Sequence, residues 1–173
     1  SDAQFDDTII GVGGGYSHTG VGQQQAMGDA SINSLHLNLY GMHHWESAYV
    51  IGIIGYGHDE FLTKRNINIG GLQNVARGDY AGDEFVSYIE SGLRLSIQGW
   101  AVQPLVGLRY LRLAQDGFTE TGAAGANLDI AGETYDSLRY SVGIRAMRSF
   151  VTSWGSVAPY LQARWTHEVL DNQ

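Results

Sequence analysis

Two acidic residues, Glu90 and Glu168, are the side chains whose type first suggests catalysis. A carboxylic acid can give or take a proton when a reacting group lies within hydrogen-bond reach. Glu90 lies in the stretch FVSYIESGLRLSI and Glu168 in VAPYLQARWTHE, and both stretches alternate apolar with polar residues. What the two carboxylates can do therefore depends on the strand faces that they occupy.

The six histidines raise the question of a metal site. His43 and His44 are adjacent, so they point to opposite faces of a strand and cannot easily hold one ion. His36 and His43 also differ in parity. The remaining three are His18, His58 and His167. We expect neither a metal site nor a cofactor.

Two short motifs resemble ligand loops only in part. The stretch GDYAGDE groups Asp79, Asp83 and Glu84, and calcium binds such oxygens. It lacks the Asp-x-Asp-x-Asp-Gly spacing of a calcium loop, so we interpret it as an acidic, solvated loop. The stretch GVGGG at 11–15 is not followed by the Gly-Lys-Ser/Thr of a phosphate loop, and its glycines fit a coiled strand better.

The composition favours an all-β chain. The 173 residues include 24 glycines, ten tyrosines and two prolines, which favours strands and turns over long helices. The formal net charge of −8 excludes nucleic-acid binding, because phosphate neutralisation needs a basic surface. There is no cysteine, and the longest nearly uninterrupted apolar run, 48–57, is too short for a membrane helix of about 20 residues.

A period of two residues predicts about seven strands, each longer than the typical strand of about 5–6 residues. The predicted strands are 8–17, 31–43, 48–61, 84–98, 101–114, 134–149 and 156–170. Long polar segments at 18–30, 70–83 and 115–133 alternate with short bends near 44–47, 99–100 and 150–155. We expect long loops at one end of an antiparallel sheet and tight turns at the other.

One face of the predicted strands is apolar and the other is polar. In strand 84–98, Leu93 and Leu95 lie on the apolar side, and Glu90 and Arg94 lie opposite. Arg, Ser, Gly, Gln and Tyr dominate the polar face, whereas a soluble surface would carry lysine and acids along its strands. This is typical of a barrel lumen with the apolar face turned to lipid. The residues expected to line the lumen are Glu90, Arg94, Arg109, Arg139, Arg145, Arg164 and Glu168.

Each short bend contains a tryptophan, although turns usually carry Gly, Asn, Asp or Ser. Trp45, Trp100 and Trp154 are therefore expected to form a girdle at the membrane interface, where an indole contacts lipid headgroups. Tyr49, Phe150 and Trp165 are candidates to extend this girdle.

Arg112 and Arg148 share the parity of the lipid-facing residues, where a cation at the bilayer midplane costs about 2–4 kcal/mol. Both must therefore lie near strand ends, Arg112 close to a long loop and Arg148 close to the Trp154 turn. Strands that span a bilayer must also close into a barrel, usually with an even number. About seven strands do not satisfy this rule, so we expect further strands outside this chain.

Several stretches resemble, in order, the C-terminal translocator β-domain of bacterial autotransporters. They are GVGGGYSHTG, LNLYGMHHWESAYVIGIIGYGHDEFLTKR, AVQPLVGLRYLRL with DGFTETG, and SLRYSVGIRAMRSF with GSVAPYLQARWTHEVLDN. The resemblance covers essentially the whole chain. It implies an antiparallel, up-and-down transmembrane β-barrel of twelve strands, of which residues 1–173 form about seven, roughly strands three to nine. The helix that threads the pore, about two earlier strands and about three later ones lie outside the chain in this alignment.

The resemblance implies a domain of the bacterial outer membrane that anchors and exports a passenger domain through a polar lumen, and that is not an enzyme. Some members cleave their passenger with lumenal acids, but this needs an asparagine-bearing helix in reach, so no catalytic residue is expected here. The implied partners are outer-membrane lipid, the passenger domain and the barrel assembly machinery. The lumenal arginines either form a basic lining for the passing chain or only pair with Glu90 and Glu168.

Two alternative functions stay open. One is a small outer-membrane barrel that acts as an adhesin or a pore and is complete with one more strand. The other is a soluble β-barrel that binds a small apolar ligand, because alternation alone also fits a barrel with its apolar face inward.

Overall fold

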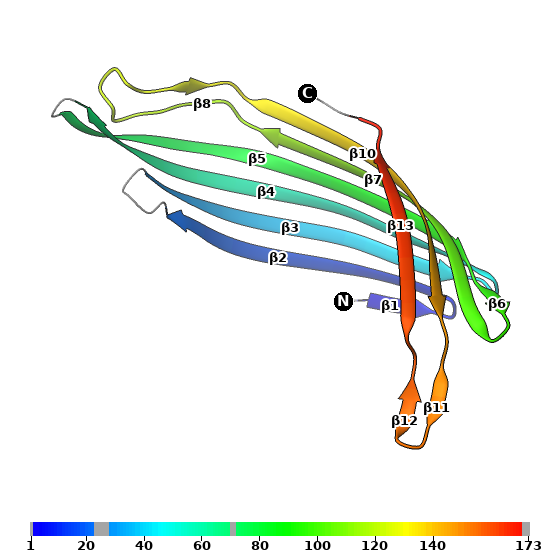
Figure 1. The fold of residues 1–173 in the computed structure, drawn as a ribbon. Coiled ribbons are helices and arrows are strands. Elements are labelled where there is room, and N and C mark those ends of the chain that lie inside the picture. The colour runs from blue at the N-terminus through cyan, green and yellow to red at the C-terminus, as the bar shows by residue number, and fades with distance from the viewer. Residues whose placement is uncertain (1, 23–27, 70–71, 171–173) are drawn as a thin grey trace.

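The computed structural model describes residues 2–22, 28–69 and 72–170, which form a curved antiparallel sheet with short hairpins attached (Figure 1). Along the sheet the strands are β1 (Asp2–Phe5), β2 (Thr8–Gly22), β3 (Gly28–His44), β4 (Ala48–Ile69), β5 (Leu72–Leu93), β7 (Trp100–Gln115), β10 (Glu133–Met147) and β13 (Tyr160–Glu168). Neighbours in space are neighbours in sequence, and all pairs are antiparallel. The predicted all-β, up-and-down architecture is confirmed.

The long strands exceed what a membrane crossing requires. β4 and β5 contain 22 residues each and β3 contains 17, whereas a transmembrane strand needs about 9–11 residues. No helix within the described ranges is long and apolar enough to span a bilayer. The five shorter strands are β6 (Leu95–Ile97), β8 (Phe118–Thr119), β9 (Asp129–Ile130), β11 (Phe150–Thr152) and β12 (Gly155–Val157).

The prediction of a loop at 70–83 is wrong for most of these residues. β4 runs on to Ile69 and β5 begins at Leu72, so only residues 70–71, which lie outside the described residues, separate the two strands. The glycines of this stretch serve packing instead of turning the chain. A Cβ at Gly78 would lie 2.4 Å from the Phe118 ring and 2.7 Å from Thr63 Oγ1. Glycine is therefore needed here because other groups come close to the backbone.

The same correction applies to two other predictions. Asp79, Asp83 and Glu84 lie in β5, not in a loop, and alternation separates Glu84 from the two aspartates. The predicted loop at 18–30 is also shorter than expected, since β2 continues to Gly22 and β3 begins at Gly28, with residues 23–27 outside the described part. The sheet therefore extends well past its predicted ends.

The segment 116–132 between β7 and β10 extends past the ends of these strands and lies beside the far end of β5 (Figure 1). Its β8–β9 hairpin continues beside β5 through a bridge between Arg77 and Thr121. The Phe118 ring stacks on Tyr80 at 4.2 Å between centroids, and Tyr80 stacks on Phe61 at 4.8 Å. The predicted loop at 115–133 is thus an ordered lobe.

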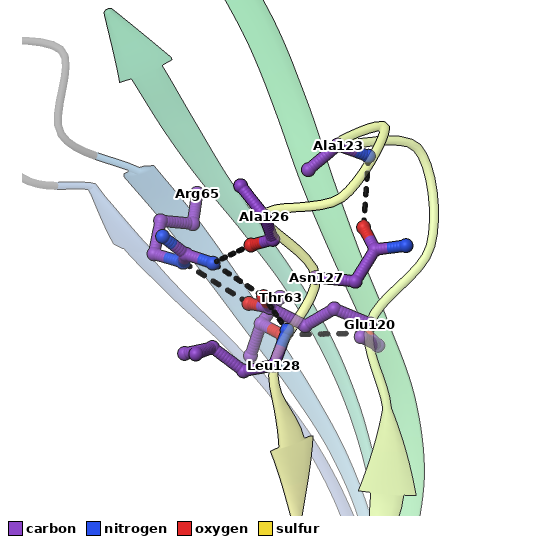
Figure 2. A network of polar contacts seen from close by, with 8 residues as sticks. Thr63, Arg65, Glu120, Ala123, Ala126, Asn127 and Leu128 are labelled. Atoms are coloured by element: carbon purple, nitrogen blue, oxygen red, sulfur yellow. Dashed lines mark hydrogen bonds and ion pairs between the residues drawn. The ribbon is translucent and has the colours of Figure 1, made fainter. Parts of the chain in front are cut away.

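A buried carboxylate fixes this lobe to the sheet (Figure 2). Glu120, 6% exposed, accepts hydrogen bonds from Arg65 Nε at 3.1 Å and from the Leu128 amide at 2.9 Å. Arg65 Nη2 also donates to the Ala126 carbonyl at 3.0 Å. The Arg65 guanidinium holds the pKa of Glu120 below its usual value. The ion pair therefore connects β4 to the lobe through two residues that are 55 positions apart in sequence.

The short-turn end differs from prediction in two bends. Gln98 and Gly99 have positive φ angles of 51° and 81° and form the turn between β6 and β7, so Trp100 is the first residue of β7 instead of a turn residue. The predicted bend at 150–155 is a separate β11–β12 hairpin that projects past the sheet (Figure 1). Trp154 lies at its tip and is 78% exposed.

Candidate functional site on the concave face

The predicted polar face forms rows of side chains across four strands. One row is Tyr88, Arg109, Arg139 and Glu168, and the next on the same face is Glu90, Gly107, Ser141 and Thr166. Arg145 pairs with Gln103 and Gln162 in a further row. Alternation along β5 and β6 places Arg94 on this face too. All seven residues predicted from the sequence therefore share one face of the sheet.

Glu90 is the centre of a polar cluster in which its carboxylate has little contact with solvent. The residue is 5% exposed and accepts the Tyr49 hydroxyl at 3.0 Å and the Tyr88 hydroxyl at 2.5 Å. Arg164 forms an ion pair with the same carboxylate and donates from Nη1 to the Tyr88 hydroxyl at 3.1 Å. A guanidinium and two phenols thus satisfy the buried charge.

The Glu90–Arg164 pair shows which way the sheet curves. β7 and β10 lie between β5 and β13, so the two backbones are about 14 Å apart along a flat sheet of this spacing. Side chains converge above a concave face and diverge above a convex one. The contact therefore makes the polar face the concave one, and Gly107 and Ser141 leave the space between the partners open.

A second carboxylate is satisfied one row further along the strands. Glu168 forms an ion pair with Arg139 and accepts the Ser137 hydroxyl at 2.9 Å. The Leu138 amide donates to its other oxygen at 2.9 Å. Ser137 is only 4% exposed, so this cluster is packed against the wall of the sheet.

Of the remaining predicted arginines, Arg145 contacts two neutral side chains. Arg145 donates to the side-chain oxygens of Gln103 and Gln162, both at 3.3 Å. Within the described part of the chain, Arg94 and Arg109 belong to neither carboxylate cluster. The concave face therefore combines guanidinium groups that are paired with Glu90 or Glu168 and guanidinium groups that lie outside both clusters.

The opposite, convex face carries exposed apolar side chains. Leu37 is 61% exposed and Val106 is 56% exposed, although both are large and apolar. Others on this face include Ile10, Leu35, Leu39, Ile54, Ile89, Leu93, Leu95, Leu108, Val142, Ile144 and Leu161. An apolar surface of this extent marks an interaction with another apolar phase.

Two tyrosines belong to the Glu90 cluster on the concave face. From the sequence, one of them is expected elsewhere and the other is not identified. Tyr49, a candidate for the membrane girdle, is 4% exposed and bonded to Glu90 instead. It pairs with Gly92, and a Cβ there would lie 2.6 Å from its ring. Tyr88 was not predicted as a site residue. Parity with Glu90 on the same strand could have found Tyr88, whereas Tyr49 depends on its register opposite Gly92.

The predicted girdle residues lie at the short-turn end but not at one level. Trp45 follows β3 and contacts His43 edge-to-face at 4.4 Å. Trp100 begins β7 and lies under Arg148, 5.8 Å from its ring centroid. Trp154 lies further out, at the tip of the β11–β12 hairpin.

The two arginines on the apolar face lie near strand ends, as expected. Arg148 follows β10 and also covers the Phe150 ring at 5.3 Å. Arg112 lies three residues before the end of β7, and its Nη1 is 3.9 Å from Asp136 Oδ1. Both cations therefore flank the central apolar band instead of lying within it.

The adjacent histidines contact different partners. His43 Nδ1 lies 2.7 Å from Thr8 Oγ1, and His44 Nδ1 lies 3.3 Å from Asp7 Oδ1. Among the residues that the structure describes, no group of three or more His, Asp or Glu side chains is arranged to hold a metal ion.

A single-layer antiparallel sheet with an apolar convex face and a polar concave face is the architecture of an outer-membrane β-barrel wall. The Autotransporter beta-domain family model matches residues 1–173, and the chain belongs to this family. Its sequence is accordingly that of a translocator β-domain of the bacterial outer membrane. This localisation excludes the soluble ligand-binding alternative.

Solved structures show the same fold. The translocator domain of the autotransporter NalP from Neisseria meningitidis has a TM-score of 0.73 at 17% identity, with 99% of this chain and 58% of that chain covered. The β-domain of the Bordetella autotransporter BrkA has a TM-score of 0.64 at 20% identity, with 97% and 66% covered.

Curated relatives are much longer than the matched region. Outer membrane protein A of Rickettsia rickettsii is 25% identical over 134 residues, which are 73% of this chain and 6% of the relative. Esterase EstA of Pseudomonas aeruginosa is 28% identical over 123 residues, or 69% and 19%. The chain thus spans less than a fifth of either relative.

Proposed function

We propose that this chain forms part of the wall of a pore through which a passenger segment crosses the outer membrane, with the concave face lining a water-filled lumen. The observation that carries the proposal is the Glu90–Arg164 ion pair, which puts the charged face inside the curve of the sheet. In a barrel that continues this curvature, the convex leucines, isoleucines and valines meet lipid. Every backbone donor and acceptor is then satisfied within the wall.

The concave face suits the passage of an unfolded chain. Glu90 and Glu168 are neutralised within the wall, so they offer no free carboxylate to retain a passing segment. Most of the exposed large apolar side chains point the other way, although Ile53 and Val86 lie on the concave face. The barrel supplies no chemical step, and folding of the passenger outside the cell draws the chain outward.

The seven residues predicted to line the lumen keep that role in this proposal, and Tyr49 and Tyr88 join them. The guanidinium groups of Arg94, Arg109 and Arg145 add positive charge to the lining outside the two carboxylate clusters. The pairs at Glu90 and Glu168 are chiefly structural. In this proposal some arginines line the path of the passing chain, and others pair with Glu90 and Glu168.

The proposed orientation follows from the two ends of the sheet. The lobe at 116–132 and the ends of β4 and β5 lie outside the cell, and the tryptophan turns lie on the periplasmic side. Trp45 and Trp100 contact headgroups at the inner boundary, and Trp154 reaches past them. The barrel assembly machinery inserts the domain. The length of the relatives supports a large passenger, although the esterase activity named for EstA belongs to that protein.

Crosslinking of a stalled passenger tests the proposal. The chain has no cysteine, so Thr166→Cys on the concave face and Ala163→Cys on the convex face of β13 can be made singly in the full-length protein. With a cysteine in a passenger that is stalled during export, we expect a disulfide to Thr166→Cys and none to Ala163→Cys. Crosslinking to Ala163→Cys alone would overturn the proposed lumen.

A further inference from the structure

We propose that the convex face holds one membrane lipid with a net negative phosphate headgroup, its acyl chain in a groove across β2–β7 and its phosphate at Arg112. This inference rests on the proposed function, because it requires the convex face to meet lipid. Three features lead to it: the shape of the groove, the position of Arg112 at its end, and a repeated polar belt at the same level.

The groove is a built feature of the apolar face. Its volume is about 460 Å³, within the range of about 300–1,000 Å³ that small-molecule sites occupy. Gly41 and Gly52, paired directly between β3 and β4, form its floor together with Ser87. The walls are the side chains of Ile10, Leu39, Ile54, Ile89 and Leu108. A flexible hydrocarbon chain fits such a trough and buries apolar surface on both sides.

One end of the groove leads to a cation. Tyr110 lines this end, and Arg112 follows two residues later on the same face of β7, about 7 Å along the strand. The Arg112 side chain is 54% exposed. Its ion pair with Asp136 is long, with 3.9 Å between Arg112 Nη1 and Asp136 Oδ1. The same aspartate oxygen accepts the Tyr110 hydroxyl at 2.6 Å. A guanidinium with five N–H donors keeps most of its capacity for a bidentate phosphate contact.

Arg112 belongs to a belt of polar side chains that runs across the convex face, and three hairpins each contribute one set of residues to this belt. In each, a tyrosine and the basic residue two positions later contact one Asn or Asp on the partner strand. The three sets are Tyr16 and His18 with Asn33, Tyr56 and His58 with Asp83, and Tyr110 and Arg112 with Asp136. Tyrosine and basic side chains of this kind favour the interface between hydrocarbon and headgroups. The groove thus ends at headgroup level.

Only the third set of the belt contains an arginine, which stays charged at any physiological pH. The two nearby carboxylates are already occupied, since Asp136 accepts Tyr110 and Asp83 accepts Tyr56 at 2.5 Å and His58 at 2.8 Å. Phe85 pairs with Arg112 on the β5 side and carries no charge. A phosphate can therefore approach Arg112 over Phe85, above the groove.

Native mass spectrometry of the full-length protein in detergent tests the site. The probes are phosphatidylglycerol, with a net negative headgroup, and phosphatidylcholine with the same acyl chains. We expect wild-type protein to retain one phosphatidylglycerol roughly tenfold better than phosphatidylcholine, the effect of one charge-assisted contact. Arg112→Gln should remove this preference. Arg77→Gln, the same change on the exposed end of β5, should preserve it.

A second variant tests the groove. A Cβ at Gly52 has no heavy atom within 4 Å, so Gly52→Leu fills the trough without straining the backbone, and it should reduce retention of both lipids. Retained preference in Arg112→Gln, or unchanged retention in Gly52→Leu, would overturn the lipid site. A detergent-dependent barrel without any lipid preference would do the same and leave the translocator proposal intact, whereas a water-soluble protein would overturn both.

Discussion

Arg164 on β13 pairs with Glu90 on β5 across two intervening strands, and this contact exists only because the charged face of the sheet is the inside of its curve. The Glu90 side chain is 6% exposed, so its carboxylate is buried. The Arg164 side chain is 28% exposed and therefore remains in partial contact with solvent. The pair therefore contributes both to the stability of the wall and to the polarity of the space that the wall encloses.

Removal of the Glu90 charge should weaken the wall. Glu90→Gln leaves the Arg164 guanidinium without its counter-charge, so we expect the free energy of unfolding to fall by about 2–3 kcal/mol. Urea titration of the full-length protein in detergent micelles measures this loss. Glu60→Gln, an exposed glutamate on β4, is the control and should change stability by less than about 0.5 kcal/mol. Equal effects would show that the Glu90 cluster is not a stabilising contact.

A methyl group at Gly143 should separate the strands that carry the polar clusters. Its Cβ would lie 2.7 Å from the Ala163 carbonyl oxygen, which belongs to the backbone of β13 and cannot rotate away. We expect Gly143→Ala to cost about 1–3 kcal/mol. Gly13→Ala, where no heavy atom lies within 4 Å, is the matched control and should be neutral. Comparable melting temperatures for both variants would contradict the close packing of β10 and β13.

Arginine scanning should separate the two faces. Val142→Arg puts a cation into the apolar band and should lower stability in the membrane by about 2–4 kcal/mol. Thr166→Arg, on the exposed concave face of the adjoining strand, should be tolerated much better. The yield of folded protein in isolated outer membranes measures both. A larger loss for Thr166→Arg would reverse the assignment of the faces.

Acid should release the lobe at 116–132. Arg65 lowers the pKa of Glu120 below its usual 4.5, so the stabilisation from this pair is complete above pH 4.5 and disappears as the pH falls through the lowered value. Hydrogen exchange of the Leu128 amide, which donates to Glu120, should accelerate over that interval. In Glu120→Gln the exchange should be fast already at pH 7 and lose this pH step, and an unchanged step would contradict the role of Glu120.

Alternation of residue types predicted the central part of the long strands and the face of the seven expected lumen residues, because this information is local. The parity of Glu90 and Arg164 placed both on one side although 74 residues separate them. Their direct contact did not follow, since it depends on curvature across four strands. Arg65 and Glu120 were missed for the same reason, because no local pattern connects a strand residue with a distant loop.

Glycine misled the sequence prediction where it serves packing. Gly78 and Gly82 made the stretch 70–83 resemble a loop, but Gly78 lies under the Phe118 ring and Gly82 against the Ala114 carbonyl. The same ambiguity hid Tyr49, whose ring covers Gly92. A glycine in a strand pattern has two physical causes, a turn or a close contact, and only the three-dimensional arrangement distinguishes them.

The side of the sheet that meets lipid can be measured at two adjacent residues of β2. Gly13 and Gly14 point to the concave and convex faces, respectively, and neither leaves a Cβ in close contact. In full-length protein reconstituted into vesicles, a fluorophore on Gly14→Cys should be quenched by nitroxide-labelled lipid, and one on Gly13→Cys by water-soluble iodide. The opposite result, with lipid quenching confined to Gly13→Cys, would contradict the assignment of the concave face to the lumen.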